Sequence, residues 1–333
     1  MILILTNKQD VHADYVIKRL GSGADVFRLN TEDILSRYRV AIGIDHQGRW
    51  DGEITDETGR SVNLRQLRVS WFRKPEFDFF SGSATDPDVQ KFVSSETRAL
   101  IETLYSLPSI TWVNDPFVAT RNKVKFQQLF LAECFGIGVP KTLITTRPEE
   151  AKKFFMECGE ELLTKAIYTG NVTINGLNQG IPSKKVDQSE FYSVYERIRY
   201  CPTLLQEYVP KSFEVRVTVI GDRVFAVKID SQEHEETKVD WRLHTPLNPH
   251  SVLALPKEVE AFCLEFLKGQ DLLFGAMDFI VTPEGEYVFL ENNPFGQYLW
   301  LEFETGLPLT QAICDLLMRL DQKPDRPLDG PQP

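Results

Sequence analysis

The chain has 333 residues, of which 42% are hydrophobic, and a formal net charge of −11. This length allows two or three domains, each with its own hydrophobic core. The acidic balance argues against nucleic acid as a partner, because proteins that bind phosphate backbones collect lysine and arginine. No apolar run approaches the roughly 20 residues of a membrane span. Residues 1–6 are apolar but lack the basic start of a signal peptide. We therefore expect a cytoplasmic protein with no membrane partner.

Five cysteines are scattered along the chain: Cys134, Cys158, Cys201, Cys263 and Cys314. They contain no Cys-x-x-Cys pair and have no histidine at ligand spacing. We expect all of them to be reduced residues of protein cores.

The first 114 residues predict an α/β domain. Residues 1–6 and 26–29 are typical of buried strands, and they flank a helix at 11–20 that Asp10 caps. The next expected elements are strands at 40–44, 50–54 and 69–72, a helix at 89–106 and a strand at 110–113. The turn signal Asn114-Asp115-Pro116 marks the first domain boundary.

Two further segments alternate helical and strand patterns. Within 115–190 we expect a helix at 122–135, a strand at 142–145, a helix at 149–158, a strand at 162–166 and a loop at 168–182. Within 191–320 we expect a strand at 204–208, hairpins at 213–229 and 276–293, a polar insertion at 231–250, and helices at 257–268 and 309–320. The polar, proline-rich tail at 321–333 is expected to be disordered.

The last hairpin carries three candidate metal ligands. If Glu284 and Gly285 form a two-residue loop, counting back along both strands places Asp278 opposite Glu291. Paired carboxylates repel each other, and their apolar neighbours make buried charge costly, so a cation between them would resolve the conflict. Asn293 lies on the same face and adds an oxygen, which predicts Mg²⁺ together with the phosphates of a nucleotide. The alternative is that both carboxylates are solvated strand ends.

Several runs of residues resemble a known family. Gly275-Ala276-Met277-Asp278-Phe279 and Phe289-Leu290-Glu291-Asn292-Asn293-Pro294 resemble the metal-binding segment of ATP-grasp ligases. Narrower runs resemble the graspetide synthetases, including the microviridin-type maturases, which cross-link ribosomal peptides: Trp71-Phe72-Arg73-Lys74-Pro75, Asp240-Trp241-Arg242 and Gly296-Gln297-Tyr298-Leu299-Trp300-Leu301-Glu302. The resemblance implies an α/β (α+β) ATP-grasp fold: a pre-ATP-grasp α/β domain at 1–114, a central subdomain at 115–190 and a C-terminal subdomain with the metal site at 191–320.

The resemblance also implies roles for single residues. Arg216 matches the arginine that steadies the transferring phosphate, and Arg242 is a second catalytic candidate. The candidate nucleotide ligands are Lys123 and Lys165 for the phosphates, Gln206, Glu207 and Val209 in the hinge that receives adenine and ribose, and Glu214. Alternatives remain for two of these assignments. Strand alternation puts Glu214 and Arg216 on one face, where a plain salt bridge would also fit, and 204–208 would also fit a plain edge strand.

The implied activity is ATP-dependent macrocyclisation of a ribosomal precursor peptide with a leader and an Asp/Glu-containing core. Side-chain carboxylates would be phosphorylated and then captured by Ser or Thr as esters, or by Lys as amides. The implied cofactors are ATP and Mg²⁺, and the implied assembly is a homodimer. The loop at 168–182, with Gly170, Gly176 and Gly180, matches a lid over the phosphates, and Arg73, Lys74 and Arg242 are candidates for holding acidic peptide segments. The alternatives are a ligase that joins free amino acids or modifies a protein terminus, and a nucleotide-binding partner protein without turnover.

Overall fold

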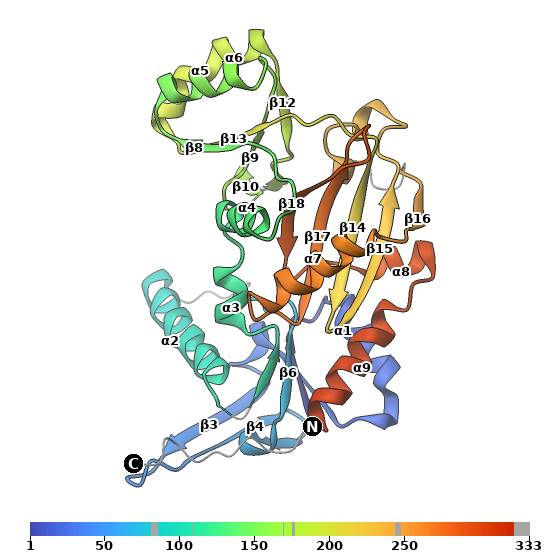
Figure 1. The fold of residues 1–333 in the computed structure, drawn as a ribbon. Coiled ribbons are helices and arrows are strands. Elements are labelled where there is room, and N and C mark those ends of the chain that lie inside the picture. The colour runs from blue at the N-terminus through green and yellow to red at the C-terminus, as the bar shows by residue number, and fades with distance from the viewer. Residues whose placement is uncertain (81–85, 109, 169, 175–176, 244–247, 323–333) are drawn as a thin grey trace. The chain divides into compact units, whose positions relative to one another are not determined.

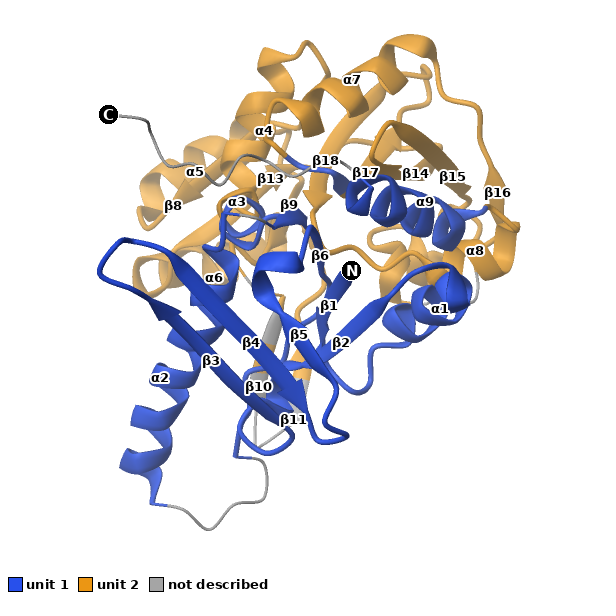
Figure 2. Cartoon of the chain, turned by 90° about the horizontal axis from the view of Figure 1, so that it is seen from below, with its two compact units in different colours: residues 1–120, 272–274, 308–333 blue, residues 121–271, 275–307 orange. Residues whose placement is uncertain are grey.

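The computed structural model describes residues 1–80, 86–108, 110–168, 170–174, 177–243 and 248–322, and Figure 1 labels its elements. The chain forms two compact units (Figure 2). Unit 1 contains residues 1–120, 272–274 and 308–333, and unit 2 contains residues 121–271 and 275–307. The predicted α/β class is confirmed. The predicted boundary at 190 lies inside unit 2 and stays a prediction, and nearly all of the predicted disordered tail lies outside the described residues.

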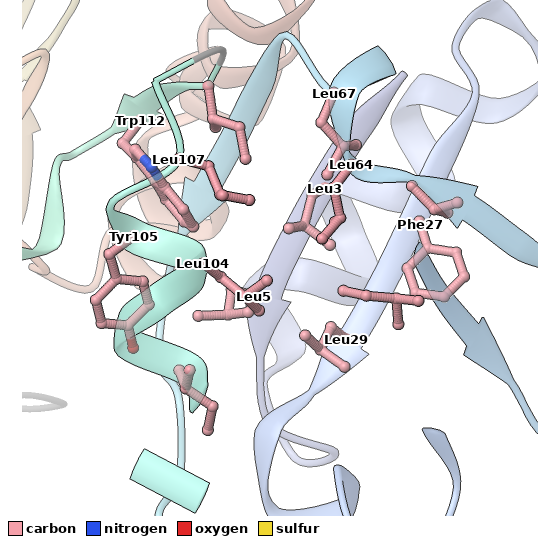
Figure 3. Close-up of a cluster of buried hydrophobic side chains, with 14 of the residues drawn as sticks. Leu3, Leu5, Phe27, Leu29, Leu64, Leu67, Leu104, Tyr105, Leu107 and Trp112 are labelled. Atoms are coloured by element: carbon pink, nitrogen blue, oxygen red, sulfur yellow. The ribbon is translucent and has the colours of Figure 1, made fainter. Parts of the chain in front are cut away.

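Unit 1 is built on a parallel sheet with the strand order β2-β1-β6-β7. Its strands are β1 (Ile2–Thr6), β2 (Val26–Asn30), β6 (Val69–Phe72) and β7 (Thr111–Val113). Every residue of β1 is buried, as expected for a parallel strand covered on both faces. Helix α9 (Leu309–Asp321) contacts β1, β6 and α1 (Val11–Leu20). In Figure 3, Leu104 and Tyr105 of α2 (Pro87–Tyr105) belong to the same buried cluster as Leu3 and Leu5 of β1.

Residues 38–63 form a separate antiparallel meander in unit 1. Its strands are β3 (Tyr38–Ile44), β4 (Trp50–Asp56) and β5 (Ser61–Asn63). The strands expected at 40–44 and 50–54 are therefore confirmed as β3 and β4, and β5 is a third strand that was not predicted.

A buried charged cluster lies at the end of β1. Asp10 caps α1 by accepting a hydrogen bond from the backbone of His12 (3.1 Å), and it accepts another from the Thr6 hydroxyl (2.6 Å). The guanidinium of Arg73 lies 3.8 Å from the same carboxylate, and both side chains belong to residues that are only 4% exposed. This burial argues against the predicted role of Arg73 in holding acidic peptide segments, whereas Lys74 is exposed.

We expect Asp10→Ala to lower the free energy of unfolding by about 3 kcal/mol, because it removes a helix cap and leaves a buried guanidinium without its carboxylate. Burial alone would raise the pKa of Asp10, but His12 and Arg73 lower it to about 2. The contribution of Asp10 to the free energy of unfolding should therefore be present at pH 7 and disappear as the pH falls from about 4 towards 2. Urea denaturation of the wild type and the variant, at pH 7 and at about pH 2, measures this difference. The control is Asp86→Ala, which removes the exposed cap of α2 and should lose about 1 kcal/mol. Equal losses would contradict the prediction.

Unit 2 contains a four-stranded antiparallel sheet with the order β12-β9-β13-β8. Its strands are β8 (Thr142–Thr145), β9 (Leu162–Lys165), β12 (Lys184–Val186) and β13 (Thr203–Glu207). Helices α5 (Pro148–Glu157) and α6 (Gln188–Val194) contribute Phe155 and Phe191 to a core that includes Leu205 of β13. Because β13 lies between β9 and β8, the edge-strand alternative for residues 204–208 is wrong.

Two predicted elements of this region are corrected. The helix expected at 122–135 is α4 (Lys125–Cys134), and a second helix, α3 (Pro116–Arg121), precedes it. Asp115 starts α3, since its side chain accepts hydrogen bonds from the backbone of Phe117 and Val118. The expected loop at 168–182 contains a hairpin of β10 (Asn171–Ile174) and β11 (Leu177–Gly180). Gly176 lies outside the described residues.

Unit 2 also contains a five-stranded antiparallel sheet with the order β16-β15-β14-β17-β18. Its strands are β14 (Phe213–Ile220), β15 (Arg223–Ile229), β16 (His250–Val252), β17 (Phe274–Val281) and β18 (Tyr287–Asn293). Helix α7 (Lys257–Lys268) contacts β14 and β15, and its Phe262 and Phe266 pack against Phe289 of β18. A short helix that the sequence did not predict, α8 (Leu299–Thr305), contacts β16.

All five cysteines are free, as predicted, but they are not all core residues. Cys263 and Cys314 are buried, whereas Cys134 and Cys201 are exposed. Within the described ranges, the chain has no helix with the length and apolar character of a membrane span.

Candidate functional site

The hairpin of β17 and β18 places Asp278 directly opposite Glu291, as predicted. Its turn differs from the prediction. The backbone N–H of Thr282 donates to the carbonyl of Glu286 (3.0 Å), so the loop has three residues and ends at Gly285 with a φ of +87°. The count over a two-residue loop was therefore wrong by one residue.

A β-bulge in β18 restores the predicted pairing. Phe289 pairs with Phe279 and Glu291 pairs with Asp278, which leaves Leu290 as the extra residue. In a regular strand Phe289 and Glu291 would share a face, because side chains alternate. Here they lie opposite adjacent residues of β17, which face opposite sides. The bulge therefore allows Phe289 to pack into the aromatic core with α7 while Glu291 faces away from it, a known use of bulges.

Asp278 forms a buried ion pair with Arg216 of the neighbouring strand β14, with 3.0 Å between Nη1 and Oδ1. The salt bridge considered as the alternative for Arg216 is not formed, because Glu214 pairs instead with Lys211 (2.6 Å). Burial raises the pKa of Asp278 to about 6 even though the Arg216 charge lowers it. A further positive charge beside this buried carboxyl group would stabilise its ionised form.

Glu291 lies among basic side chains. Lys125 Nζ is 3.7 Å from one of its oxygens, and Arg242 Nη1 is 3.5 Å from the other. Burial alone would raise the pKa of Glu291, but Lys125, Arg242 and Lys165 outweigh it and hold the pKa below its usual value. Lys125 also donates to the carbonyl of Ala166 (3.0 Å), and so joins the hairpin to the end of β9.

The predicted polar insertion supplies Arg242 and its support. Two nitrogens of Arg242 each lie 2.8 Å from an oxygen of Asp240, which is the bidentate geometry of a strong pair. Burial alone would raise the pKa of Asp240, but Arg242 lowers it to about 2. Trp241 is buried between these two residues in the chain, and the Arg216 guanidinium lies 5.7 Å from its ring. The insertion therefore positions both candidate catalytic arginines.

The four-stranded sheet carries Lys165 and Gln206 on the face opposite to the core residue Leu205. Gln206 is 3% exposed and donates to the Thr142 hydroxyl (2.9 Å). Its Oε1 atom is buried and accepts no hydrogen bond from the described residues, as expected of an atom that awaits a donor from a ligand. Burial lowers the pKa of Lys165 to about 8, and the charge of Glu291 opposes this shift.

The other predicted residues have separate contacts. Lys123 precedes α4 rather than lying within it, and its amine is 4.4 Å from the Phe295 ring. Burial lowers the pKa of Lys123. Glu207 ends β13 and accepts a hydrogen bond from the backbone of Lys141 (3.2 Å). Val209 is half-buried in the segment that follows β13. The roles of these residues stay predictions.

The donor set fits a hard metal ion that arrives with an anion. Asp278, Glu291 and Asn293 share a face of the hairpin and offer only oxygen, which is what Mg²⁺ prefers. In the part of the chain that the structure describes, no group of three or more His, Cys, Asp or Glu is placed to hold a metal. An Mg²⁺ ion bound here would complete its shell with water and phosphate oxygens. Even with Asp240 counted beside Asp278 and Glu291, the surrounding cations outnumber the carboxylates and suit a polyphosphate; they are Arg216, Arg242, Lys125 and Lys165.

No family model matches the chain. A probable alpha-L-glutamate ligase of Shewanella oneidensis is 24% identical over 230 residues, which are 67% of this chain and 73% of that protein. A RiPP-associated ATP-grasp ligase of Chryseobacterium gregarium, solved with ADP and a leader and core peptide, has a TM-score of 0.88 at 26% identity and covers 97% of both chains. The macrocyclase MdnC of Microcystis aeruginosa, solved with the precursor peptide MdnA, has a TM-score of 0.84 at 27% identity and covers 96% of this chain and 99% of its own. The chain is an ATP-grasp ligase.

In this ligase, sequence reasoning missed one basic residue of the site. Lys125 lies two residues after the predicted Lys123, at the start of α4, yet Lys125 is the one that contacts Glu291. A lysine at the start of a helix has the pattern of a solvated side chain, so only the contact across the fold distinguishes it. Asp240 and Trp241 were noted for their resemblance but not as supports of the arginines.

Proposed function

We propose that the ligase is an ATP-dependent macrocyclase of a ribosomally made precursor peptide. The observation that carries the proposal is the pair Asp278 and Glu291, held among Arg216, Arg242 and Lys125 on a fold that matches two peptide-bound ligases over nearly their whole length. One of those relatives was solved with ADP as well as its peptide. Curated glutamate ligases share less of the chain, which favours the peptide substrate over free amino acids.

The chemistry has two steps. A side-chain carboxylate of the peptide attacks the γ-phosphorus of ATP, so that ADP leaves and an acyl phosphate forms on the peptide. A Ser or Thr hydroxyl, or a Lys amine, then attacks the carbonyl carbon, loses its proton and expels phosphate to give an ester or an amide. Each cross-link therefore removes the elements of one water from the peptide.

The residues of the chain contribute position and charge. Asp278, Glu291 and Asn293 would hold Mg²⁺, which neutralises phosphate charge when bound. Arg216 presents a planar fork of donors to the transferring phosphate, and Arg242 lies beside it near Glu291. Lys165 binds phosphate oxygens. Catalysis of this kind depends mostly on positioning and electrostatics. A homodimer and a cytoplasmic location complete the proposal.

The test is mass spectrometry of a candidate precursor peptide after incubation with the ligase, ATP and Mg²⁺. The expected result is the loss of one water for each linkage, with equal release of ADP. ATP consumption with free glutamate and none with peptide would favour the amino-acid ligase. Nucleotide binding without turnover of any acceptor would favour the alternative of a nucleotide-binding partner protein that is not an enzyme.

The lowered pKa of Lys165 gives a pH prediction. Its amine is charged below about pH 8 and becomes neutral above it. Because the charged form attracts phosphate, ADP affinity should fall as the pH rises from about 7 to 9. In Lys165→Arg the charge persists, so this fall should vanish. Calorimetric titration at both pH values measures it. Lys153→Arg, at an exposed lysine of α5, should behave as the wild type. The same pH profile in Lys165→Arg and the wild type would reject the assignment.

A further inference from the structure

Gln128 of α4 makes a matched pair of hydrogen bonds to the backbone of β18. Its Oε1 accepts from the N–H of Asn292 (2.8 Å), and its Nε2 donates to the carbonyl of Asn292 (2.8 Å). The side chain belongs to a residue that is only 2% exposed. A buried backbone group needs a partner, and here one carboxamide satisfies both groups of a single residue. Gln128 therefore acts at this point as a neighbouring strand would.

The contact falls at a sensitive point of the hairpin. Asn292 lies between Glu291 and Asn293, which are two of the three candidate metal ligands. Strand β18 is at the edge of the five-stranded sheet, and among the described residues its outer side pairs with no further strand, although an isolated bridge joins Val288 to Gly138. On the other side of the bulge, the N–H of Phe289 donates to the carbonyl of Gly138 (2.8 Å). The bulge that turns Glu291 towards the site is thus held on both sides, and Gln128 provides one of the two attachments.

The same side chain ties the hairpin to the segment that carries the basic residues. Gln128 Nε2 also donates to the carbonyl of Asn122, whose side chain donates to the carbonyl of Gln270 (3.1 Å). Lys123 follows Asn122, and Lys125, on the first turn of the same helix, contacts Glu291. Gln128 therefore fixes the spacing between these lysines and the carboxylates.

We propose that Gln128 is a positioning residue for the metal and phosphate site: it sets the backbone of β18 so that Glu291 and Asn293 present their oxygens together. The inference rests on the proposed use of Mg²⁺ and nucleotide. Gln128 itself binds neither of them. Partners that orient metal ligands change metal affinity about 10- to 100-fold when they are removed.

The test compares Gln128→Met with Gln270→Met. Methionine keeps the length of the side chain and fills the same space, but it makes none of these three hydrogen bonds. Gln270 is a second buried glutamine of unit 2, and its side chain donates to the Phe266 carbonyl (3.1 Å). The readout is the affinity for ADP by calorimetry with and without Mg²⁺, together with the unfolding temperature of each variant.

Gln128→Met should weaken ADP binding in Mg²⁺ about tenfold or more and weaken metal-free ADP binding less, while Gln270→Met binds as the wild type. If Gln128→Met and the wild type bound ADP equally well in Mg²⁺, the role of Gln128 would be wrong, but the proposed function would not be affected. The same loss in both variants would also overturn the role of Gln128, since general destabilisation would explain the loss. If Gln128→Met does not fold, Gln128→Asn keeps an uncharged carboxamide that is one methylene too short to hold both backbone groups of Asn292, and it should still weaken binding. If ADP binding by the wild type did not depend on Mg²⁺, the proposed metal site itself would be wrong.

Discussion

Replacement of Arg216 by methionine is expected to lower kcat/KM for peptide cross-linking about 10³-fold, because an arginine at a transferring phosphate contributes at least that much. In the structure the guanidinium is held at 3.0 Å from Asp278 and lies against Trp241, so it is positioned before substrate arrives. Methionine removes the charge and leaves Asp278 buried without its partner. Lysine at this position keeps the charge but loses the planar fork, so Arg216→Lys should recover only part of the activity.

Steady-state kinetics with peptide and ATP measure this effect. Arg223→Met is a matched control, because Arg223 is an exposed arginine of the adjacent strand β15 that stacks on Phe225. The control should keep wild-type kinetics. If Arg216→Met kept most of the wild-type kcat/KM, Arg216 would not be a catalytic residue.

Glu291→Gln is expected to lower turnover about 10³-fold by removing one of the two carboxylates that we propose as metal ligands, since a metal ion supplies several kcal/mol of charge stabilisation. The change keeps the shape of the side chain but removes its charge. Lys125 and Arg242 then lose their counter-charge. ADP should therefore bind at least as well as to the wild type without Mg²⁺, while Mg²⁺ should no longer strengthen its binding.

This opposite response separates a metal ligand from a structural carboxylate, which would weaken both kinds of binding. Calorimetry with ADP, in the presence and absence of Mg²⁺, measures it. The control is Glu284→Gln in the exposed turn of the same hairpin, which should match the wild type. Retained Mg²⁺ dependence in both Glu291→Gln and Asp278→Asn would reject the metal assignment.

Local patterns predicted many elements well. The expected strand at 69–72 and the helices at 11–20 and 257–268 coincide with β6, α1 and α7. The buried residues of α1 and α7 recur at helical spacing, and β6 is a short, mostly apolar run that is almost wholly buried, so neighbours in sequence are enough to reveal each of them. The family resemblance likewise named the ATP-grasp fold, which the comparisons with solved structures support.

The pairing of Asp278 with Glu291 was predicted correctly from a count that contained two opposite errors. The loop has one residue more than expected, and the bulge at Leu290 adds one residue to β18. A bulge leaves little trace in a hydrophobic pattern, because it arises where Phe289 and Glu291 need opposite surroundings. The sequence shows both residues, but it does not show the one-residue shift in strand register between them.

Residue types and strand periods in the sequence by themselves predicted a hairpin with three candidate oxygen ligands, and the quoted motifs resembled the family that the solved structures support. The tertiary structure decided which cations meet those ligands. Lys125 and Gln128 come from α4, Arg242 comes from the insertion, and Arg216 comes from β14, all far along the chain from β18. Such contacts depend on the packing of distant elements and leave no periodic signal, because the charge and hydrogen-bonding groups that select them are brought together only in the folded chain.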